Sequence, residues 1–161
     1  MFKLFKKNKT EAVVAPATGQ LIKIESVSDD VFSQKMMGDG FAVEPAHNDI
    51  VSPVAGTIST VFPTKHAIGI TTDEGLEVLV HMGLDTVELN GEPFEMHVKP
   101  GEHVEPNTAL ATMDLDKVKA GGKGTTIVIV YTNMDKIDSV PTVEPQYVDH
   151  GDSVGTLTYQ K

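Results

Sequence analysis

The stretch VFPTKHAIGITTDEGLEVLVHMGLDTV, residues 61–87, decides the fold that we expect for this chain. Two apolar runs with alternating polarity flank a polar turn at residues 72–75, and this pattern predicts a β-hairpin. Each run carries one histidine, His66 in the first and His81 in the second. If residues 72–75 form the whole loop without a bulge, the two histidines lie directly opposite each other, with Cβ atoms about 4.5 to 5.5 Å apart.

The alternation also predicts which side chains share a face. Successive side chains of a strand point to opposite sides, so a strand running from Phe62 to Ile70 places Thr64 and His66 on one face. A bulge at Gly75 would shift the register by one residue, which keeps the two imidazoles close but not opposed. The sequence therefore predicts that the two histidines lie close together, and that the length of the turn decides whether they lie directly opposite each other.

The composition of the whole chain is that of a globular protein. Its 161 residues are 40% apolar, which is enough for one domain with a hydrophobic core. Helix signals are sparse, whereas short Val-, Ile- and Thr-rich runs recur among 14 glycines and 9 prolines. We therefore predict an all-β protein, an antiparallel β-sandwich or barrel with short helical turns.

Internal repeats support a sheet built from similar units. Residues 15–22 and 52–59 share a Pro-x-x-Gly motif before a β-rich run. Residues 98–104 resemble residues 148–154, each with a turn glycine between two valines. Because glycine adopts positive φ at little cost, we expect these glycines to form the turns of the repeated hairpins.

The charge and the missing residue types exclude several functions. A net charge of −10, with no cluster of Lys and Arg beyond the N-terminus, argues against nucleic-acid binding, because phosphate backbones are bound by clustered cations. The chain has no cysteine, which excludes disulfides, thiol catalysis and thiolate metal sites. It also lacks a secretory signal and an apolar run of membrane-spanning length, so we expect a cytoplasmic protein.

The N-terminal residues 1–12, MFKLFKKNKTEA, are basic with interspersed apolar side chains. We expect a flexible, solvated tail there, with weak contact to an anionic membrane surface as the alternative. A single domain is expected over residues 13–161.

Residues 29–41 form an excursion between the repeated units. Its side chains Phe32, Met36, Met37 and Phe41 are more apolar than a loop requires. They either plug the sandwich or form an exposed docking patch, since Phe and Met are favoured in both settings. The pattern leaves both interpretations open.

Two histidines on one face need a partner other than each other, because burying neutral imidazoles unpaired costs free energy. Two chemistries fit the pair. One ring can act as a nucleophile toward a phosphoryl group while the other binds the phosphoryl oxygens, or both rings can bind a zinc ion that needs further ligands. Thr64 beside His66 favours the first chemistry, because a hydroxyl can fix the tautomer of a ring.

Five motifs together carry a resemblance to a known family. They are Phe32-Ser33-Gln34-Lys35-Met36-Met37-Gly38-Asp39-Gly40, Pro53-Val54-Ala55-Gly56-Thr57, Thr64-Lys65-His66-Ala67, Val80-His81-Met82-Gly83-Leu84-Asp85-Thr86-Val87 and Asn133-Met134-Asp135. With these motifs the chain resembles the IIA protein or domain of the glucose class of the bacterial sugar phosphotransferase system, from about Val13 to the C-terminus. The resemblance implies a β-sandwich of the duplicated hybrid motif type, related to lipoyl and biotinyl carriers.

The resemblance implies an activity and the residues that perform it. His81 matches the histidine that accepts a phosphoryl group on Nε2 from the phosphohistidine of the small carrier HPr, and that passes it to a cysteine of a sugar-specific IIB domain. His66 matches a second histidine needed for onward donation, and Thr64 matches the hydroxyl that orients it. The implied protein is a phosphotransferase component with a phosphohistidine intermediate and no required cofactor.

The resemblance also implies a docking surface around the histidines. Phe32, Phe62 and Leu79 match positions of an apolar rim. Asp29 and Asp85 match carboxylates near the site, which repel the charged phosphohistidine and help the phosphoryl group to leave.

Zinc binding and regulation supply the alternatives. Members of the family can bridge a zinc ion with the two histidines, here His66 and His81, and a carboxylate of a partner. A zinc hydrolase is the rival enzyme, but the His-x-His pattern of such peptidases is broken by Gly83. A regulatory module that binds transporters or kinases through the rim is the non-enzymatic rival, and it is compatible with phosphoryl carrying.

Overall fold

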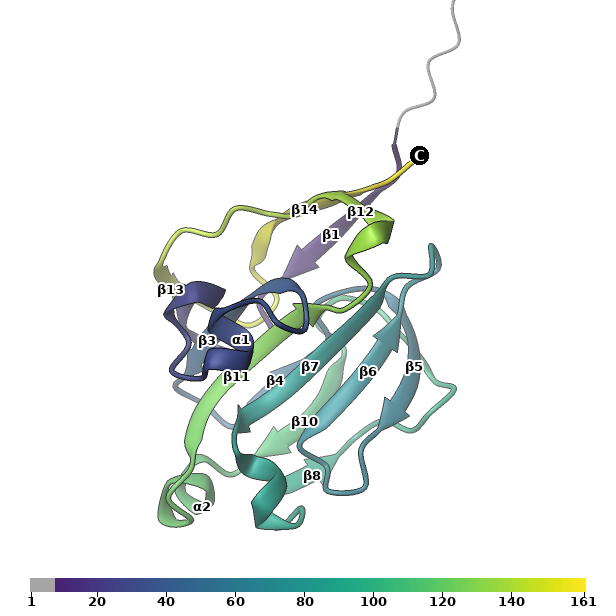
Figure 1. Cartoon of the computed structure of the whole chain (residues 1–161). Coiled ribbons are helices and arrows are strands. Elements are labelled where there is room, and N and C mark those ends of the chain that lie inside the picture. Colours follow the sequence, from purple (N-terminus) through teal and green to yellow (C-terminus); the bar gives the residue numbers. More distant parts are fainter. Residues whose placement is uncertain (1–7) are drawn as a thin grey trace, which may run out of the picture.

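Short apolar runs between glycine and proline turns form fourteen strands in the computed structural model, which describes residues 8–161 (Figure 1). Two α-helices and three 3-10 helices of this region connect them. The strands are β1 (Thr10–Val14), β2 (Gly19–Lys23), β3 (Asp39–Pro45), β4 (Asp49–Val51), β5 (Gly56–Val61), β6 (Ala67–Thr71), β7 (Glu77–Leu84), β8 (Phe94–Met96), β9 (His103–Val104), β10 (Ala109–Met113), β11 (Gly124–Tyr131), β12 (Ile137–Ser139), β13 (Gln146–Val148) and β14 (Ser153–Tyr159). The helices are η1 (Ile24–Ser26), α1 (Asp30–Ser33), η2 (Thr86–Leu89), α2 (Leu115–Ala120) and η3 (Met134–Lys136).

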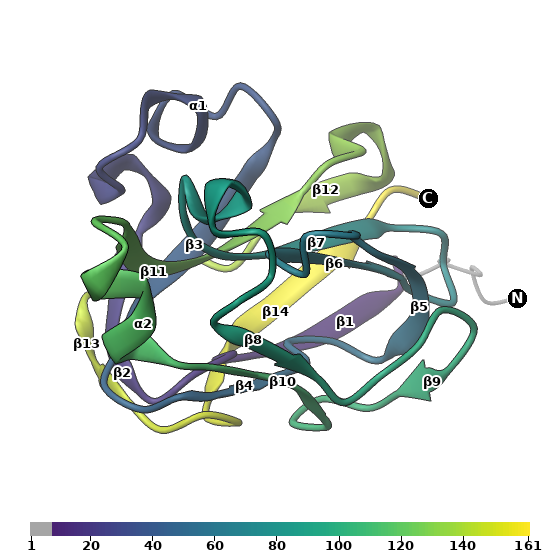
Figure 2. The ribbon, with the colours of Figure 1, turned by 90° about the horizontal axis from the view of Figure 1, so that it is seen from below.

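The strands pair into one large sheet and two small ones, and every pair is antiparallel. The large sheet has the order β13-β2-β3-β11-β7-β6-β5-β9, and the small sheets have the orders β4-β10-β8 and β1-β14-β12. Figure 2 shows β4, β10 and β8 facing β7 and β6 across the core. The predicted all-β antiparallel sandwich with short helical turns is confirmed.

The core lies between these layers, and the alternation on β7 shows why. Val80 and Met82 are fully buried on its inner face, whereas Leu79 and His81 are only partly buried on its outer face. Each large apolar side chain that is removed from water contributes about 1.5 to 3 kcal/mol. Strand β11 differs because η1 and α1 also cover its outer face, so that both of its faces are buried.

The two Pro-x-x-Gly segments are joined by a pair of backbone hydrogen bonds. The backbone N–H of Val14 donates to the Pro53 carbonyl at 2.9 Å, and the N–H of Val51 donates to the Pro16 carbonyl at 2.8 Å. Such a reciprocal exchange is what two copies of one unit produce. The sequence repeat is therefore also a structural repeat.

The glycines of the repeats serve two purposes. Gly101 and Gly151 have φ values of +93° and +88°, as predicted for turns. Gly19 and Gly56 instead begin strands β2 and β5, and a Cβ at either position would overlap a backbone carbonyl oxygen of the neighbouring strand. The prediction that the first pair forms turns is wrong, because close approach of two strands requires glycine there.

The N-terminal part of the described chain is ordered earlier than predicted. Strand β1 begins at Thr10 and pairs with β14, so residues 10–12 belong to the sandwich rather than to a tail. The rest of the predicted tail up to residue 7 lies outside the described residues. Across residues 8–161, none of the helices is long and apolar enough to span a membrane.

The turn of the decisive hairpin is longer than predicted. The loop between β6 and β7 comprises residues 72–76, with Gly75 at a φ of +90°. The register therefore pairs Ala67 with His81, and the predicted direct opposition of His66 and His81 is wrong. The register is shifted by one residue, as expected for an extra residue at the turn.

The first strand of the hairpin is also shorter than predicted. Strand β6 starts at Ala67, and residues 62–66 form the loop that follows β5. Lys65 has a left-handed φ of +61°, which reverses the chain direction within this loop. The direction of the Thr64 and His66 side chains is thus set by a loop and not by strand alternation.

The apolar excursion of residues 29–41 divides between the two predicted roles. Phe32 and Phe41 are buried, at 5% and 1% exposure, on opposite faces of the large sheet. Met36 and Met37 are exposed, at 71% and 40%. The aromatic side chains therefore fill cores, and the methionines lie on the surface.

Candidate functional site

The loop after β5 and the strand β7 bring the two histidines together on the outer face of the large sheet. The ring centroids of His66 and His81 lie 5.2 Å apart, and the rings meet edge to face at 76°. The loop is tied to the strand because the N–H of Met82 donates to the His66 carbonyl at 2.7 Å. The predicted proximity of the pair is present, although it arises from a loop.

His81 is held by the backbone of its own strand. Its Nδ1 lies 2.8 Å from the Gly83 carbonyl oxygen. Because a carbonyl only accepts hydrogen bonds, Nδ1 carries the proton, and Nε2 keeps its lone pair. Gly83 has a φ of +85°, and a Cβ there would overlap Thr86, so only glycine turns this carbonyl toward the ring without displacing its neighbours.

Thr64 and His66 are in contact, as the sequence predicted. The Thr64 Oγ1 lies 2.6 Å from His66 Nδ1. When the hydroxyl donates, Nδ1 accepts and Nε2–H becomes a hydrogen-bond donor. The ring of Phe62 packs edge-on against His66, with centroids 5.3 Å apart at 73°, and limits its rotation.

Burial keeps both histidines neutral. Desolvation and the neighbouring His66 lower the pKa of His81 from 6.5 to about 4. The Gly83 carbonyl and the carboxylates of Asp29 and Asp85 act in the opposite direction. Burial also lowers the pKa of His66. Near pH 7 the pair therefore offers a free lone pair rather than a positive charge.

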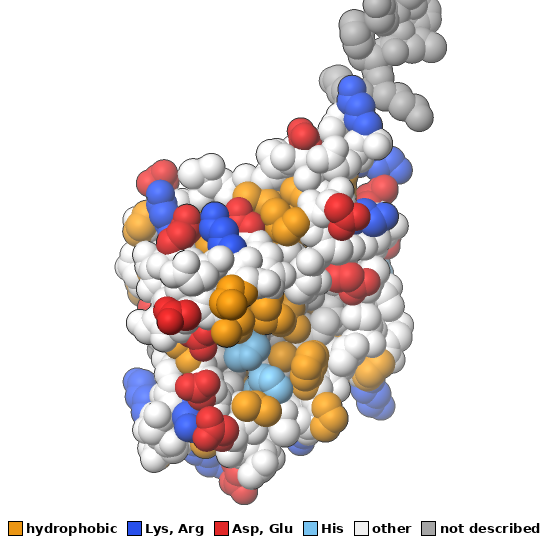
Figure 3. Space-filling model, in the orientation of Figure 1, with side chains coloured by type: hydrophobic (Ala, Val, Ile, Leu, Met, Phe, Trp, Pro, Cys, Tyr) orange, Lys and Arg blue, Asp and Glu red, His pale blue; other side chains and the backbone are white. Residues whose placement is uncertain are grey.

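The histidines form part of the floor of a shallow hollow of about 290 Å³. Figure 3 shows histidine side chains surrounded by hydrophobic ones on this face, with acidic side chains nearby. The five predicted docking residues all line the hollow, and they are Asp29, Phe32, Phe62, Leu79 and Asp85. The surface around the histidines is thus mainly apolar, with carboxylates beside it.

Sequence reasoning missed part of this surface. Val31 and Val87, which were not predicted as docking residues, also line the hollow and are 42% and 47% exposed, so they offer more apolar surface than Phe32 does. Met37, which was left open as part of a docking patch, lines the hollow as well and is 40% exposed. Val31 and Val87 lie in short helices that alternation cannot predict. The Gly83 carbonyl was missed as well, and the glycine two residues after His81 was the available signal.

Two histidines would supply only two of the four ligands of a tetrahedral zinc site. Four ligands are usual for zinc, and no group of three or more His, Cys, Asp or Glu side chains placed to hold a metal occurs within residues 8–161. A zinc ion on His66 and His81 would need the remaining ligands from water or from another protein. The neutral rings instead suit one nucleophilic nitrogen beside one hydrogen-bond donor.

Comparison with known proteins gives a consistent result. The family model described as phosphoenolpyruvate-dependent sugar phosphotransferase system, EIIA 1, matches residues 11–137. A glucose-specific EIIA component of Staphylococcus aureus is 44% identical over 94% of this chain and 93% of its own length. A glucose-specific EIIA component of Halalkalibacterium halodurans is 48% identical over 85% of this chain and 83% of its own length.

A longer relative and a solved structure agree with this assignment. The glucose-specific EIICBA component of Streptococcus pneumoniae is 58% identical over 83% of this chain, which spans only 18% of that protein. The structure of glucose permease IIA from Mycoplasma capricolum superposes with a TM-score of 0.84 at 39% identity, and it covers 95% of this chain and 99% of its own. The chain therefore belongs to the EIIA 1 family of the phosphoenolpyruvate-dependent sugar phosphotransferase system.

Proposed function

We propose that this chain is a phosphocarrier that accepts a phosphoryl group on Nε2 of His81 and passes it onward. The observation that carries the proposal is the contact of His81 Nδ1 with the Gly83 carbonyl, because it leaves Nε2 unprotonated. The lowered pKa of His81 keeps this nitrogen a nucleophile throughout the neutral pH range. The hollow gives another protein access to it.

The proposed uptake step is a balanced exchange between two imidazoles. The lone pair of His81 Nε2 forms a new N–P bond while the N–P bond to the donor histidine breaks. The electron pair of the broken bond returns to the donor ring, which leaves as neutral imidazole because its other nitrogen keeps its proton. Nδ1–H of His81 stays on the Gly83 carbonyl and stabilises the positive charge that the ring gains.

His66 acts on the phosphoryl group rather than on His81. With Thr64 donating to Nδ1, the Nε2–H of His66 donates to a phosphoryl oxygen and stabilises its negative charge. Phosphoryl transfer depends mainly on positioning and on such charge stabilisation. The carboxylates of Asp29 and Asp85 repel the bound group, which favours its departure.

The proposed donor is phosphorylated HPr, and the proposed acceptor is the cysteine of a IIB domain of a sugar permease. In the onward step the cysteine thiolate forms an S–P bond as the His81 N–P bond breaks. The name of one relative, a glucose-specific EIICBA component, supports a IIB domain as the acceptor. We propose that the protein carries out this reaction in the cytoplasm and requires no cofactor for it.

Mass spectrometry tests the site. The protein is incubated with phosphorylated HPr and the labelled residue is mapped. We expect a label on His81 in the wild type, no label in His81→Ala, and full labelling in His47→Ala, which removes an exposed histidine elsewhere. A label that persists in His81→Ala rules out the assignment.

A second variant tests the division of labour within the pair. We expect His66→Gln to accept the phosphoryl group but not to donate it, because the amide keeps a hydrogen-bond donor while the ring chemistry is lost. Single-turnover transfer to a IIB domain measures this. Normal onward transfer by His66→Gln contradicts the role given to His66.

The exposed apolar surface around the hollow also supports a regulatory function. Regulated transporters or kinases are proposed as further partners that bind this surface according to its phosphorylation state. Pull-downs with the wild type and His81→Asp compare the two charge states. Equal recovery of every partner by both proteins contradicts a charge-dependent switch.

A further inference from the structure

Phe32 lies in the wall of the site rather than at its docking surface. Its side chain is 5% exposed, and its ring centroid lies 4.9 Å from that of His81 at a tilt of 59°. It packs in the outer cluster with Val128 and Val130 of β11. A partner protein can touch little of Phe32, whereas the His81 ring is in van der Waals range.

The helix that carries Phe32 needs support from outside. Helix α1 contains only four residues, and its one side-chain cap is the Asp29 carboxylate, which accepts from the Val31 N–H at 2.9 Å. A helix of this length is unstable by itself, because it cannot repay the cost of nucleation. Contacts beyond the helix must therefore hold Phe32 against the sheet.

Lys35 ends this helix in a conformation that usually selects glycine. Its φ is +58°, its N–H donates to the Phe32 carbonyl at 2.9 Å, and the next N–H, of Met36, donates to the Val31 carbonyl at 3.0 Å. This is the Schellman arrangement, whose left-handed residue is commonly glycine. A lysine in this conformation has a steric cost that glycine does not have, and contacts made by its side chain can offset that cost.

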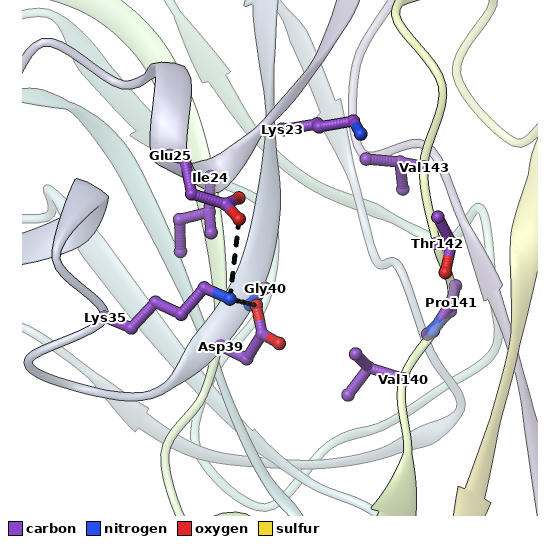
Figure 4. A pocket seen from close by; sticks show the side chains of 10 residues that line it. All are labelled: Lys23, Ile24, Glu25, Lys35, Asp39, Gly40, Val140, Pro141, Thr142 and Val143. Carbon is purple, nitrogen blue, oxygen red and sulfur yellow. Dashed lines mark hydrogen bonds and ion pairs between the residues drawn. The ribbon is translucent and has the colours of Figure 1, made fainter.

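The side chain of Lys35 reaches the chain segments on both sides of α1. Figure 4 shows its ammonium between the carboxylates of Glu25 in η1 and Asp39 at the start of β3. The Nζ lies 3.5 Å from Glu25 Oε2 and 3.6 Å from Asp39 Oδ1. Asp39 is itself held, since Oδ1 also accepts the Gly40 N–H at 2.8 Å. The bridge thus joins the segment before α1 to the strand after it.

We propose that Phe32 is a positioning residue for His81, and that the Glu25–Lys35–Asp39 bridge is the clasp that holds it in place. The proposal rests on the phosphocarrier function and adds the residues that hold the His81 ring in position. The Phe32 ring confines the His81 imidazole on one side while His66 confines it on another. It also excludes water from the face that it covers.

Two consequences separate this role from docking. Removing Phe32 should admit water to His81 and favour the charged ring, in an environment where Asp29 and Asp85 already attract a positive charge. Removing it should also slow the transfer step while leaving partner binding nearly unchanged, because the residue is buried. If Phe32 were a docking residue, its removal would weaken partner binding and leave the transfer step nearly unchanged.

Proton NMR titration of the His81 ring is the first test, and it needs no phosphoryl donor. We expect Phe32→Leu to raise the midpoint by about one pH unit, and Lys35→Met to raise it by about half a unit. The controls are Val31→Ala, on the exposed side of the same helix, and Lys23→Met, which lines the same cavity of about 170 Å³ as Lys35. Both should stay within about 0.2 units of the wild type.

Kinetics of phosphorylation by HPr is the second test. Phe32→Leu should lower kcat about tenfold with KM changed less than about twofold, whereas Val31→Ala should raise KM. Lys35→Met changes a surface side chain and keeps the fold testable if Phe32→Leu unfolds. An unchanged midpoint in both Phe32→Leu and Lys35→Met overturns the proposal, and an equal shift in Lys23→Met overturns the clasp. Loss of all labelling with the expected midpoints refutes the phosphocarrier function alone.

Discussion

The two faces of the large sheet are built from the same strands but are covered differently. On the inner face, Val80 and Met82 of β7 are fully buried against the small sheets. On the outer face, Leu79 and His81 meet only the partial cover of η1 and α1, and the hollow begins where that cover ends. An incompletely covered apolar face provides two conditions at once, a dry environment for a nucleophile and an exposed surface for a partner.

Neighbouring truncations on β7 test this contrast most strongly. Met82→Ala should lower the free energy of unfolding by about 2 to 5 kcal/mol, because it leaves a cavity in a closed core. Leu79→Ala should cost about 1 kcal/mol, because its side chain is already partly exposed. Urea denaturation measures both. Equal losses would mean that the two faces are equally well packed.

The pH dependence of the free energy of unfolding tests whether water is excluded from His81 on the outer face. The folded pKa of His81 is about 4 against an ordinary 6.5, so between these values the unfolded chain binds a proton that the folded chain does not. Stability is therefore lost as pH falls from 6.5 to 4, by about 3 kcal/mol, and this loss stops below the folded pKa.

His81→Gln lacks this titration and should gain stability relative to the wild type by the same amount between pH 7 and pH 4. Urea titrations of both proteins across this range give the difference, and groups shared by the two proteins cancel in it. A difference that does not change with pH would show that His81 is as hydrated in the folded chain as in the unfolded one.

Two glycines with similar backbone angles sharpen the comparison between a site and a plain turn. Gly83 and Gly101 have φ values of +85° and +93°, but an added Cβ meets Thr86 at the first position and nothing within 4 Å at the second. Gly83→Ala should therefore cost about 1 to 3 kcal/mol more than Gly101→Ala.

Gly83→Ala should also slow phosphorylation by HPr, since the carbonyl that holds His81 moves. Thermal unfolding and the labelling rate are the two measurements. Equal stability and equal labelling in the two alanine variants would show that the turn tolerates a side chain beside the histidine.

The smallest expected effect concerns the support of His66. Thr64→Val removes the hydroxyl bonded to Nδ1 and should cost about 1 kcal/mol, while Thr64→Ser keeps the bond. Nitrogen NMR of the His66 ring should show a changed tautomer balance in Thr64→Val only. The same balance in both variants would mean that another group sets the tautomer.

The sequence was sufficient to predict an all-β antiparallel fold, the proximity of the two histidines and the position of Thr64 beside His66. It failed on the register of the hairpin, because one extra residue in the loop changes which residues of the two strands lie opposite each other. It also failed on the start of β6, because Lys65 has a left-handed φ of +61° that lysine rarely adopts, and no glycine or asparagine marks the turn at that position. Local sequence patterns predict strands better than they predict the loops between strands and the register that those loops set.

The part of the site that could not be predicted depends on backbone geometry and on burial. The Gly83 carbonyl contacts His81 because Gly83 adopts a φ of +85°, and the glycine two residues after His81 was the only signal of it. Phe32 was expected at the docking surface, whereas its burial, at 5% exposure, depends on how α1 packs against β11. Tertiary packing decided the burial of Phe32, which no short motif encodes.

The pairing of β1 with β14 has a consequence for the order of assembly during synthesis. Thr10 is the partner of Thr158, so the first strand of the described chain must wait for the last one. Long-range pairing of this kind slows folding, because the chain must close a large loop before it gains the contact. On the ribosome, the small sheet that contains both strands can be completed only after β14 has emerged.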